Sequence, residues 1–221
     1  MGSFELLIGG KPVALAPNGQ RLVGYLAVHG PQRRYALAGR LWGWTSDAQA
    51  RATLRTALWR IRTVAPGLLR VDRDEVSIGP LVRVDFVEST SLALSVLARV
   101  PVGGETYSPD LFTSDLLPGW SEDWLQLERE RHHQLRIHAL EALSDQLRST
   151  GAYAAAIDVA YRAIAAEPLR ESAHAALIRA HLAEGNRVEA VRQLAQFRRL
   201  LAEELGLAPS ERLESLLLEA A

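Results

Sequence analysis

The second half of the chain contains an internal repeat with a period of 34 residues, which restricts its possible folds more than any other feature. The segment GAYAAAIDVAYRAIA begins at Gly151, and GNRVEAVRQLAQFRR begins at Gly185. The matched pairs are Gly151/Gly185, Ala156/Ala190, Ile157/Val191, Ala160/Leu194 and Ala163/Phe197. This period is typical of tetratricopeptide-like repeats, in which each copy is a pair of antiparallel helices. We therefore expect packed helical hairpins in which small residues let the helices approach closely.

The two copies end differently, and a longer helix precedes them. Pro168 is placed to end the second helix of the first copy, whereas the next proline, Pro209, comes later than the period predicts. We therefore expect a longer helix in the second copy. Upstream, we expect a long helix that runs to about residue 149. Its core side is predicted to carry Trp120, Trp124 and Leu127.

The first half has a different pattern, with short strands and three helices. Apolar runs at 4–8 and 12–16 flank Gly9-Gly10 and predict a hairpin, and LLRVDRDEVSIG predicts a second one. Between them we expect helices at about 19–28, capped by Asn18, and at about 35–41. A third helix follows the N-cap types Thr45, Ser46 and Asp47 and stops before Pro66-Gly67.

The charge balance also divides the chain into two parts. Residues 1–85 hold 12 basic and 6 acidic side chains, whereas residues 86–221 hold 13 basic and 20 acidic ones. Asp85 and Glu88 have the spacing of a capping box, and helical pattern dominates after them. We place the domain boundary there and expect domains at 1–84 and 85–221. A basic first half favours a polyanionic partner.

The third helix contains the stretch ARATLRTALWRIR, which has four arginines and no acid. At about 100° per residue from Arg51, the side chains of Arg62, Arg55 and Trp59 lie at roughly 20°, 40° and 80°. The apolar core side occupies roughly 260–340°, and Arg60 lies apart near 180°. These arginines could simply be solvated or paired with acids elsewhere. However, like charges on one helix side repel each other, which favours a negatively charged partner.

The order of elements in the first half favours a winged helix that binds DNA. Two short helices precede the arginine-rich helix, and a hairpin follows it. In a winged helix the third helix enters the major groove, where the arginine fork can bond guanine O6 and N7 together. Phosphate contacts would add affinity that falls with salt. Arg70 and Arg73 in the second hairpin are placed to touch the DNA backbone, although acidic neighbours weaken that assignment.

The run LWGWTSDAQARATLRTALWRIR, followed by a hairpin and a helical repeat, resembles the SARP family of bacterial transcriptional activators. The segments DLLPGWSEDWLQLERERHHQLRIHALEAL and EAVRQLAQFRRLLAEELGLAPSERL resemble the same family. The resemblance implies a mainly α protein with small β hairpins. It would consist of an OmpR/PhoB-like winged helix and an all-α, tetratricopeptide-like bacterial transcriptional activator domain.

The resemblance also implies a function and a set of contact residues. Family members bind direct repeats in promoter DNA as side-by-side homodimers and recruit RNA polymerase. The residues implied to face the groove are Arg51, Thr53, Arg55, Thr56 and Trp59, and those implied to touch the backbone are Arg60 and Arg62. Trp59 departs from the family pattern, in which smaller residues are common at this position. The alternatives are an adaptor or an effector-sensing regulator in which the helical half is the working part.

The sequence gives little support for a metal site, a cofactor or an enzyme. The chain has no cysteine, and its six histidines form no zinc-protease motif, so we expect no metal and no cofactor. His133 and His138, near Glu130 and Glu141, are expected to be exposed helix residues. No phosphate-binding glycine motif or nucleophile elbow occurs, so we expect no enzyme. Without a membrane span or export signal, we expect a cytoplasmic protein.

Overall fold

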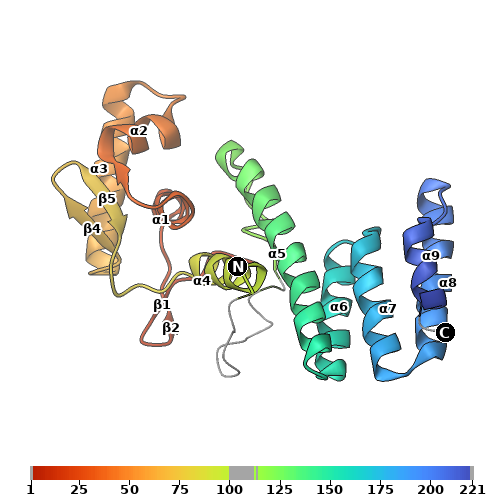
Figure 1. Cartoon of the computed structure of the whole chain (residues 1–221). Helices are drawn as coiled ribbons and strands as arrows, with labels where there is room; N and C mark the ends of the chain where they lie inside the picture. Colours follow the sequence, from red (N-terminus) through yellow and green to blue (C-terminus); the bar gives the residue numbers. More distant parts are fainter. Residues whose placement is uncertain (1, 100–111, 113, 220–221) are drawn as a thin grey trace. The chain divides into compact units, whose positions relative to one another are not determined.

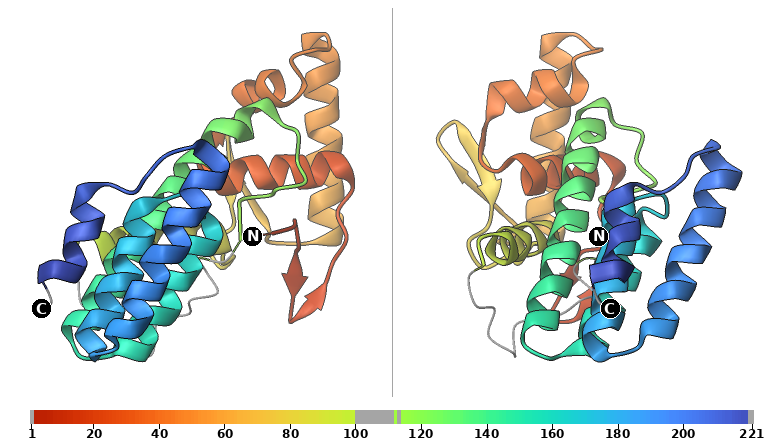
Figure 2. Two further views of the ribbon diagram at one scale, coloured as in Figure 1. Left: turned by 90° about the vertical axis from the view of Figure 1, so that its right-hand side faces the viewer. Right: turned by 45° about the vertical axis from the view of Figure 1, so that its right-hand side comes forward.

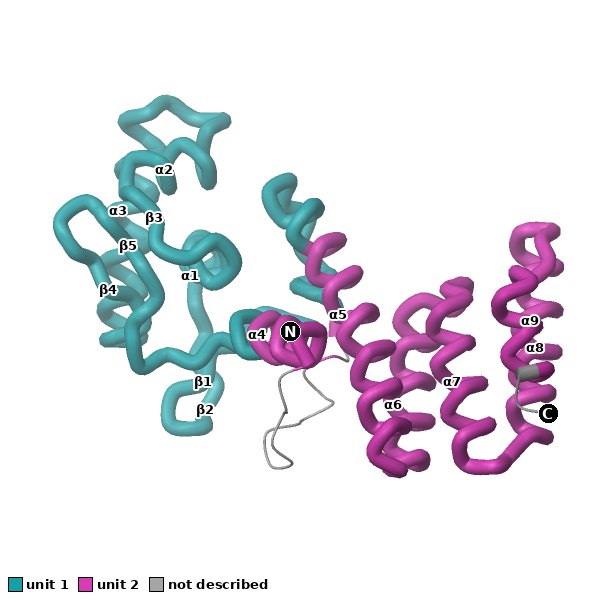
Figure 3. Tube along the Cα trace, in the orientation of Figure 1, with its two compact units in different colours: residues 1–88, 115–128 teal, residues 89–114, 129–221 magenta. Residues whose placement is uncertain are grey.

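A computed structural model of the chain describes residues 2–99, 112 and 114–219. The chain divides into two compact units, coloured separately in Figure 3. Unit 1 comprises residues 1–88 and 115–128, and unit 2 comprises residues 89–114 and 129–221. Unit 1 is therefore discontinuous in sequence. The boundary expected near residue 84 remains a prediction.

Unit 1 contains short strands and three helices over residues 7–78 (Figure 1). In chain order its elements are β1 (Leu7–Ile8), β2 (Lys11–Pro12), α1 (Pro17–His29), β3 (Gln32–Arg33), α2 (Arg34–Trp42), α3 (Asp47–Val64), β4 (Leu69–Asp72) and β5 (Glu75–Ile78). β1 and β2 form the expected first hairpin. In the second sheet, β5 lies between β3 and β4 and pairs antiparallel with both.

The core of unit 1 joins the three helices to this second sheet. Apolar side chains from every helix and from β5 are fully or almost fully buried, namely Leu22, Leu26, Leu37, Leu41, Leu54, Ile61 and Val76. They recur at helical spacing along each segment, so each helix has one apolar side. Three packed helices followed by a β hairpin form the winged helix predicted from the sequence.

The start of α1 differs from the sequence prediction. Asn18 does not cap this helix, because the helix already begins at Pro17 and Ala16 is its N-cap. Proline is favoured there, since its missing N–H would have no helical acceptor. The side chain of Asn18 instead accepts a hydrogen bond of 3.2 Å from the indole Nε1 of Trp42. This bond joins the beginning of α1 to the end of α2.

Residues 115–128 complete unit 1 with an aromatic cluster. Trp120 precedes helix α5 (Asp123–Ser149) rather than lying on it, and it stacks on Phe4 with ring centroids 6.0 Å apart. Trp124 lies in the first turn of α5 and meets Tyr25 edge-on at 5.0 Å. Leu127 is 66% exposed, so its expected core role is wrong.

Unit 2 is helical over its described residues. Helix α4 (Asp85–Leu97) begins within unit 1, where Glu88 pairs with Arg83 at 2.6 Å, and α5 likewise continues from one unit into the other. The repeat itself consists of α6 (Tyr153–Ala166), α7 (Glu171–Glu184), α8 (Arg187–Leu205) and α9 (Glu211–Glu219). Helices α6, α7 and α8 lie side by side, and α9 packs on α7 and α8 (Figures 1 and 2).

The packing of unit 2 follows the 34-residue repeat. Ala156, Ala160 and Ala163 of α6 are completely buried, and their counterparts on α8 are also buried. Helix α8 has 19 residues and α6 has 14, which confirms the expected longer helix in the second copy. Val191 is 47% exposed, whereas its counterpart Ile157 is partly buried against the α6–α7 core.

Candidate nucleic-acid interface

Helix α3 is held by a cap at its beginning and by a buried side along its length. The Oγ atom of Ser46 accepts a hydrogen bond from the backbone N–H of Gln49, at 3.4 Å. The residues of α3 that are buried in the unit 1 core are Ala50, Leu54, Ala57 and Ile61. Because these four residues lie on one side, they fix the rotation of the helix about its axis and therefore which side faces outward.

The four arginines of α3 all lie on the exposed part of its surface. They are Arg51, Arg55, Arg60 and Arg62. Among the residues that the structure describes, none of these four takes part in an ion pair. Asp47 is the one acid in this helix, and it stands in the first turn, where the helix dipole favours negative charge. The exposed surface of α3 therefore carries concentrated positive charge.

The remaining candidate residues of α3 line a groove of about 490 Å³ within unit 1. Its walls include Ala14, Ala16, Ala52, Thr53, Thr56 and Trp59. Arg60 also borders this groove, whereas Arg51, Arg55 and Arg62 lie outside it. The candidate residues thus divide between an arginine side and a groove side of the same helix. Trp59 is 67% exposed, so most of its indole is open to a partner.

The threonines of α3 use their hydroxyl protons within the helix. Thr53 donates to the carbonyl oxygen of Gln49 at 3.0 Å, and Thr56 donates to that of Ala52 at 3.1 Å. Thr63 makes the same bond to the carbonyl oxygen of Trp59, at 3.0 Å. Each bond spans four residues and closes on the preceding turn. A partner would therefore meet the methyl group and the acceptor oxygen of each threonine.

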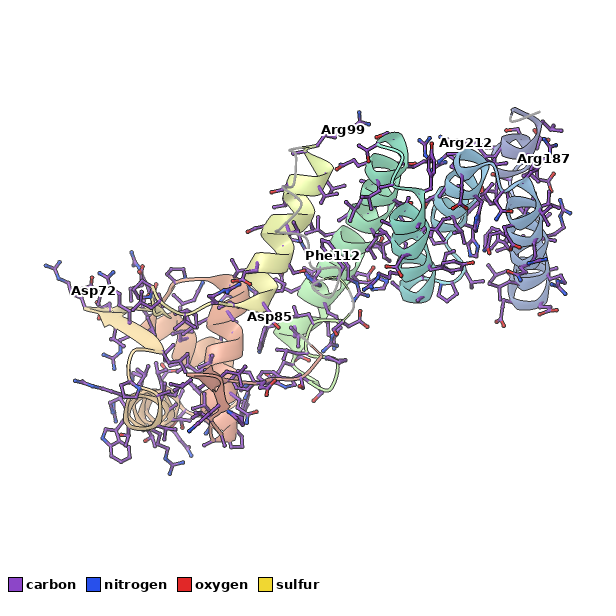
Figure 4. All side chains as sticks on the ribbon, turned by 90° about the horizontal axis from the view of Figure 1, so that it is seen from below. Asp72, Asp85, Arg99, Phe112, Arg187 and Arg212 are labelled. Carbon is purple, nitrogen blue, oxygen red and sulfur yellow. The ribbon has the colours of Figure 1, made fainter. Side chains whose placement is uncertain are left out.

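The hairpin formed by β4 and β5 carries Arg70 and Arg73, the two residues that the sequence suggested for contacts to the DNA backbone. Arg70 pairs with Asp72 on the same strand at 3.3 Å, and both side chains are 64% exposed. Asp72 lies at the tip of this hairpin (Figure 4). Arg73 follows it in the turn, with a φ of 48°. Arg73 therefore stands at the tip of the hairpin, while the charge of Arg70 is already partly balanced.

Sequence reasoning missed several exposed residues of unit 1 near these elements. Arg33 belongs to β3, a strand of two residues that pairs with β5 and adds a basic side chain to the sheet. Tyr35 and Trp44 are 69% and 68% exposed. The adjacent arginines 33 and 34 were the one signal in the sequence that could have pointed to this basic strand. The pairing of β3 with β5, which lies far along the chain, leaves no periodic pattern to detect.

Arg21 connects α1 to the loop before α3. Its Nη2 atom lies 2.6 Å from the Oε2 atom of Glu122, and its guanidinium carbon lies 4.4 Å from the centre of a Trp44 ring. The Arg21 side chain is only 19% exposed. This arginine therefore helps to position the loop that precedes α3, and its charge is already paired within unit 1.

The histidines of unit 2 belong to polar networks. His133 is 18% exposed and its Nε2 atom lies 3.3 Å from Glu167, so the expectation that it is an exposed residue is wrong. His138, at 55% exposed, contacts Arg170 and fits that expectation. In the described part of the chain, no three His, Cys, Asp or Glu side chains are grouped as a metal site. Nor does that part contain a helix long and apolar enough to cross a membrane.

A solved structure supports the fold of the whole chain. The structure described as Mycobacterium tuberculosis EmbR in complex with a low-affinity phosphopeptide matches with a TM-score of 0.72. The match covers 99% of this chain and 63% of that chain, at 17% identity. At this level of identity the likeness concerns the fold alone.

Sequence comparisons point to regulatory proteins. The regulatory protein AfsR of Streptomyces coelicolor is 30% identical over 197 residues, which is 83% of this chain and 20% of AfsR. AfsR of Streptomyces griseus is 29% identical over 229 residues, which is 96% of this chain and 22% of that protein. The chain thus spans about a fifth of the length of these curated relatives. Residues 109–219 match the family described as the bacterial transcriptional activator domain. The chain therefore belongs to the SARP family of bacterial transcriptional activators.

Proposed function

We propose that the chain binds promoter DNA in a sequence-specific manner, with α3 as its recognition helix. The observation that carries this proposal is the set of four exposed arginines on α3 that form no ion pair with any described residue. An α-helix fits the major groove of B-DNA, and arginine is the commonest side chain to bond guanine there. The buried side of α3 fixes which residues can face the groove.

Different arginines have different parts in this proposal. Arg51 and Arg55, near the N-terminal half of α3, contact bases together with Thr53, Thr56 and Trp59. Arg60 and Arg62 contact phosphates, as do Arg70 and Arg73 of the hairpin. Base contacts discriminate between sequences, whereas phosphate contacts strengthen binding to every duplex.

A selection from a random duplex pool, followed by binding measurements, tests the proposal. Arg55→Ala should weaken binding to the selected duplex about tenfold or more and leave binding to random duplex much less affected. Arg62→Ala should weaken binding to both duplexes and reduce the salt slope by about one. The matched control is Arg199→Ala, which removes an exposed arginine from α8 in unit 2. If the full chain retains no duplex from the pool at low salt, the proposal is wrong.

We further propose that the protein binds direct repeats as a homodimer and recruits RNA polymerase through unit 2. The acidic balance of residues 86–221 and the family membership support this division of labour. On this view the protein acts in the cytoplasm and catalyses no reaction. Transcription in vitro with purified polymerase tests it, since the chain should raise transcript yield only from a promoter that carries its selected repeat.

The second candidate is an adaptor that works through unit 2. The exposed side chains of Val188 and Val191 on α8, at 67% and 47%, favour it, because apolar groups there are open to a protein partner. If the chain is an adaptor, Val188→Glu should weaken the binding of its protein partner. Arg55→Ala should leave that binding unchanged. A sensor of a small effector would instead change its DNA affinity when that effector is added.

A further inference from the structure

The arginines flank the line of α3 that lies opposite its buried side, but they do not occupy it. Leu58 and Ala65 also pack into the unit 1 core beside the four buried residues of α3. At about 100° per residue, these six residues centre near 290°, so the line opposite lies near 110°. Within roughly 30° of this line stand four residues, namely Ala52, Thr56, Trp59 and Thr63. We call these residues the outer line of α3. Arg51, Arg55 and Arg62 lie to one side of it, and Arg60 lies to the other.

The outer line presents apolar groups to a partner. Ala52 offers a methyl group, and Trp59 offers an exposed indole. The hydroxyl protons of Thr56 and Thr63 are bonded to backbone carbonyls one turn back, at 3.1 and 3.0 Å. These two threonines therefore offer a methyl group and no free hydroxyl proton. A surface of methyl groups between cationic flanks has a specific complement in the major groove.

That complement is the C5 methyl group of thymine. Thymine is the one DNA base that carries a methyl group in the major groove, and alanine and threonine methyls are its usual contacts. Ala52 and Thr56 are one helical turn apart, about 6 Å along the axis. Base pairs are about 3.4 Å apart along each strand, so these two residues would reach methyl groups about two base pairs apart.

We propose that the outer line of α3 reads thymine methyl groups, with Thr56 and Ala52 as the specificity-determining residues. This inference rests on the proposed function, because it assumes that α3 lies in the major groove. It adds the chemical feature that the helix recognises at the centre of its site. The arginines then account for flanking guanine and phosphate contacts.

Uracil-substituted duplexes test this inference directly. Deoxyuridine pairs as thymidine does but lacks the methyl group. In the duplex selected by the full chain, each thymidine is replaced singly by deoxyuridine, and the Kd is measured for each duplex. At one or two positions the wild-type protein should bind about threefold to fivefold more weakly, as expected for one buried methyl group.

Variants then assign each methyl group. Thr56→Ser keeps the hydroxyl and its backbone bond but removes the methyl, so it should bind the thymidine and deoxyuridine duplexes equally at one position. Ala52→Gly should do the same at a second position about two base pairs away. As a matched control, Arg62→Ala should weaken binding to both duplexes and keep the wild-type ratio between them.

Three results would overturn the inference while the proposed function stands. The first is specific binding to a duplex whose selected motif contains no thymine. The second is a Kd that stays unchanged at every uridine position. The third is Thr56→Ser and Ala52→Gly proteins that keep the full wild-type sensitivity to uridine. By contrast, a chain that selects no duplex at all overturns the proposed function itself.

Discussion

Identical side chains have different roles in this protein because their surroundings differ. Arg21 is 19% exposed, paired with Glu122 at 2.6 Å and placed over Trp44, so its charge is used within unit 1. Arg55 is exposed, and no described acid pairs with it. Because the Arg21–Glu122 pair is partly buried, water and salt screen it less than they screen a surface pair. Arg21→Ala should therefore lower the stability of unit 1. Arg55→Ala should instead lower the affinity for the DNA that we propose as the partner.

His174 is a buried titratable group of unit 2. This histidine is buried between α7 and α8 and stacks on Phe197, with ring centroids 3.9 Å apart. Its Nδ1 atom lies 2.7 Å from the amide Nε2 of Gln193, and its Nε2 atom lies 2.8 Å from the carbonyl oxygen of Pro168. Burial lowers the pKa of His174 below its usual 6.5, although the bond to Pro168 partly opposes this.

We predict that acid destabilises unit 2 through His174. Because its pKa is lower in the folded state, the unfolded chain binds a proton first as the pH falls below 6.5. The contribution to stability is complete above pH 6.5 and is lost as the pH falls toward the folded pKa. Urea unfolding followed by circular dichroism at pH 7.5 and 5.5 measures this loss. The His174→Gln protein should be less stable at pH 7.5 and lose less stability between the two values; an equal loss would contradict the assignment.

At the scale of elements, two glycines of unit 1 differ in their surroundings: backbone atoms crowd Gly79, whereas Gly39 stands in open space. Gly79 follows β5 and donates its N–H to the carbonyl oxygen of Leu68, at 2.8 Å. A Cβ atom at residue 79 would lie only 2.0 Å from the carbonyl oxygen of Gly67. Gly39, in α2, has no atom within 4 Å of its Cβ position. The first glycine is needed for close packing, whereas the second is not.

We predict opposite effects for alanine at these two glycines. Gly79→Ala should lower the free energy of unfolding of unit 1 by about 2–4 kcal/mol, because the turn after α3 must shift. Gly39→Ala should raise it by about 0.5–1 kcal/mol through the better helix propensity of alanine. Urea denaturation of both proteins checks the signs. A neutral Gly79→Ala protein would mean that this turn does not constrain the end of α3.

The elements that sequence predicted are those with local signals. Ser46 and Pro66 bracket α3 closely, and the 34-residue period gave the helical hairpins of unit 2. The strand β3 has only two residues, so no alternation could reveal it. Likewise, Leu127 has the residue type of a core position, but its exposure depends on packing between distant segments. The arginine stripe of α3 followed from helix geometry, whereas the hydrogen bonds of Thr56 and Thr63 on the outer line required coordinates.

At the scale of the whole molecule, residues 115–128 matter to unit 1 although they lie far from residues 1–88 in sequence. Trp124 contacts the rings of Tyr25 and His29, with centroids 5.0 and 5.6 Å away. The apolar cluster around Leu116, Leu117 and Leu125 also includes Phe4. Expression of residues 1–84 alone tests the boundary predicted from the sequence, since such a fragment lacks all of these contacts.

We predict that Trp124→Ala in the full chain destabilises unit 1 selectively. The loss should be about 2–4 kcal/mol for a partly buried tryptophan. All five tryptophans belong to unit 1, so fluorescence reports on that unit, while helical circular dichroism reports mainly on unit 2. The fluorescence midpoint in urea should fall more than the dichroism midpoint. Leu127→Ala, at a 66% exposed position on the same helix, is the control and should change neither by much.

The discontinuity of unit 1 limits how hybrid regulators can be made from this chain. The polypeptide crosses between the units three times, after residues 88, 114 and 128. A single splice near residue 84 would join the first 84 residues of a relative to a segment, 115–128, that packs within this chain's own unit 1. A working chimera must therefore exchange two stretches of the gene together. The same requirement would bear on natural recombination, which would need three breakpoints, one at each crossing, to transfer unit 1 alone.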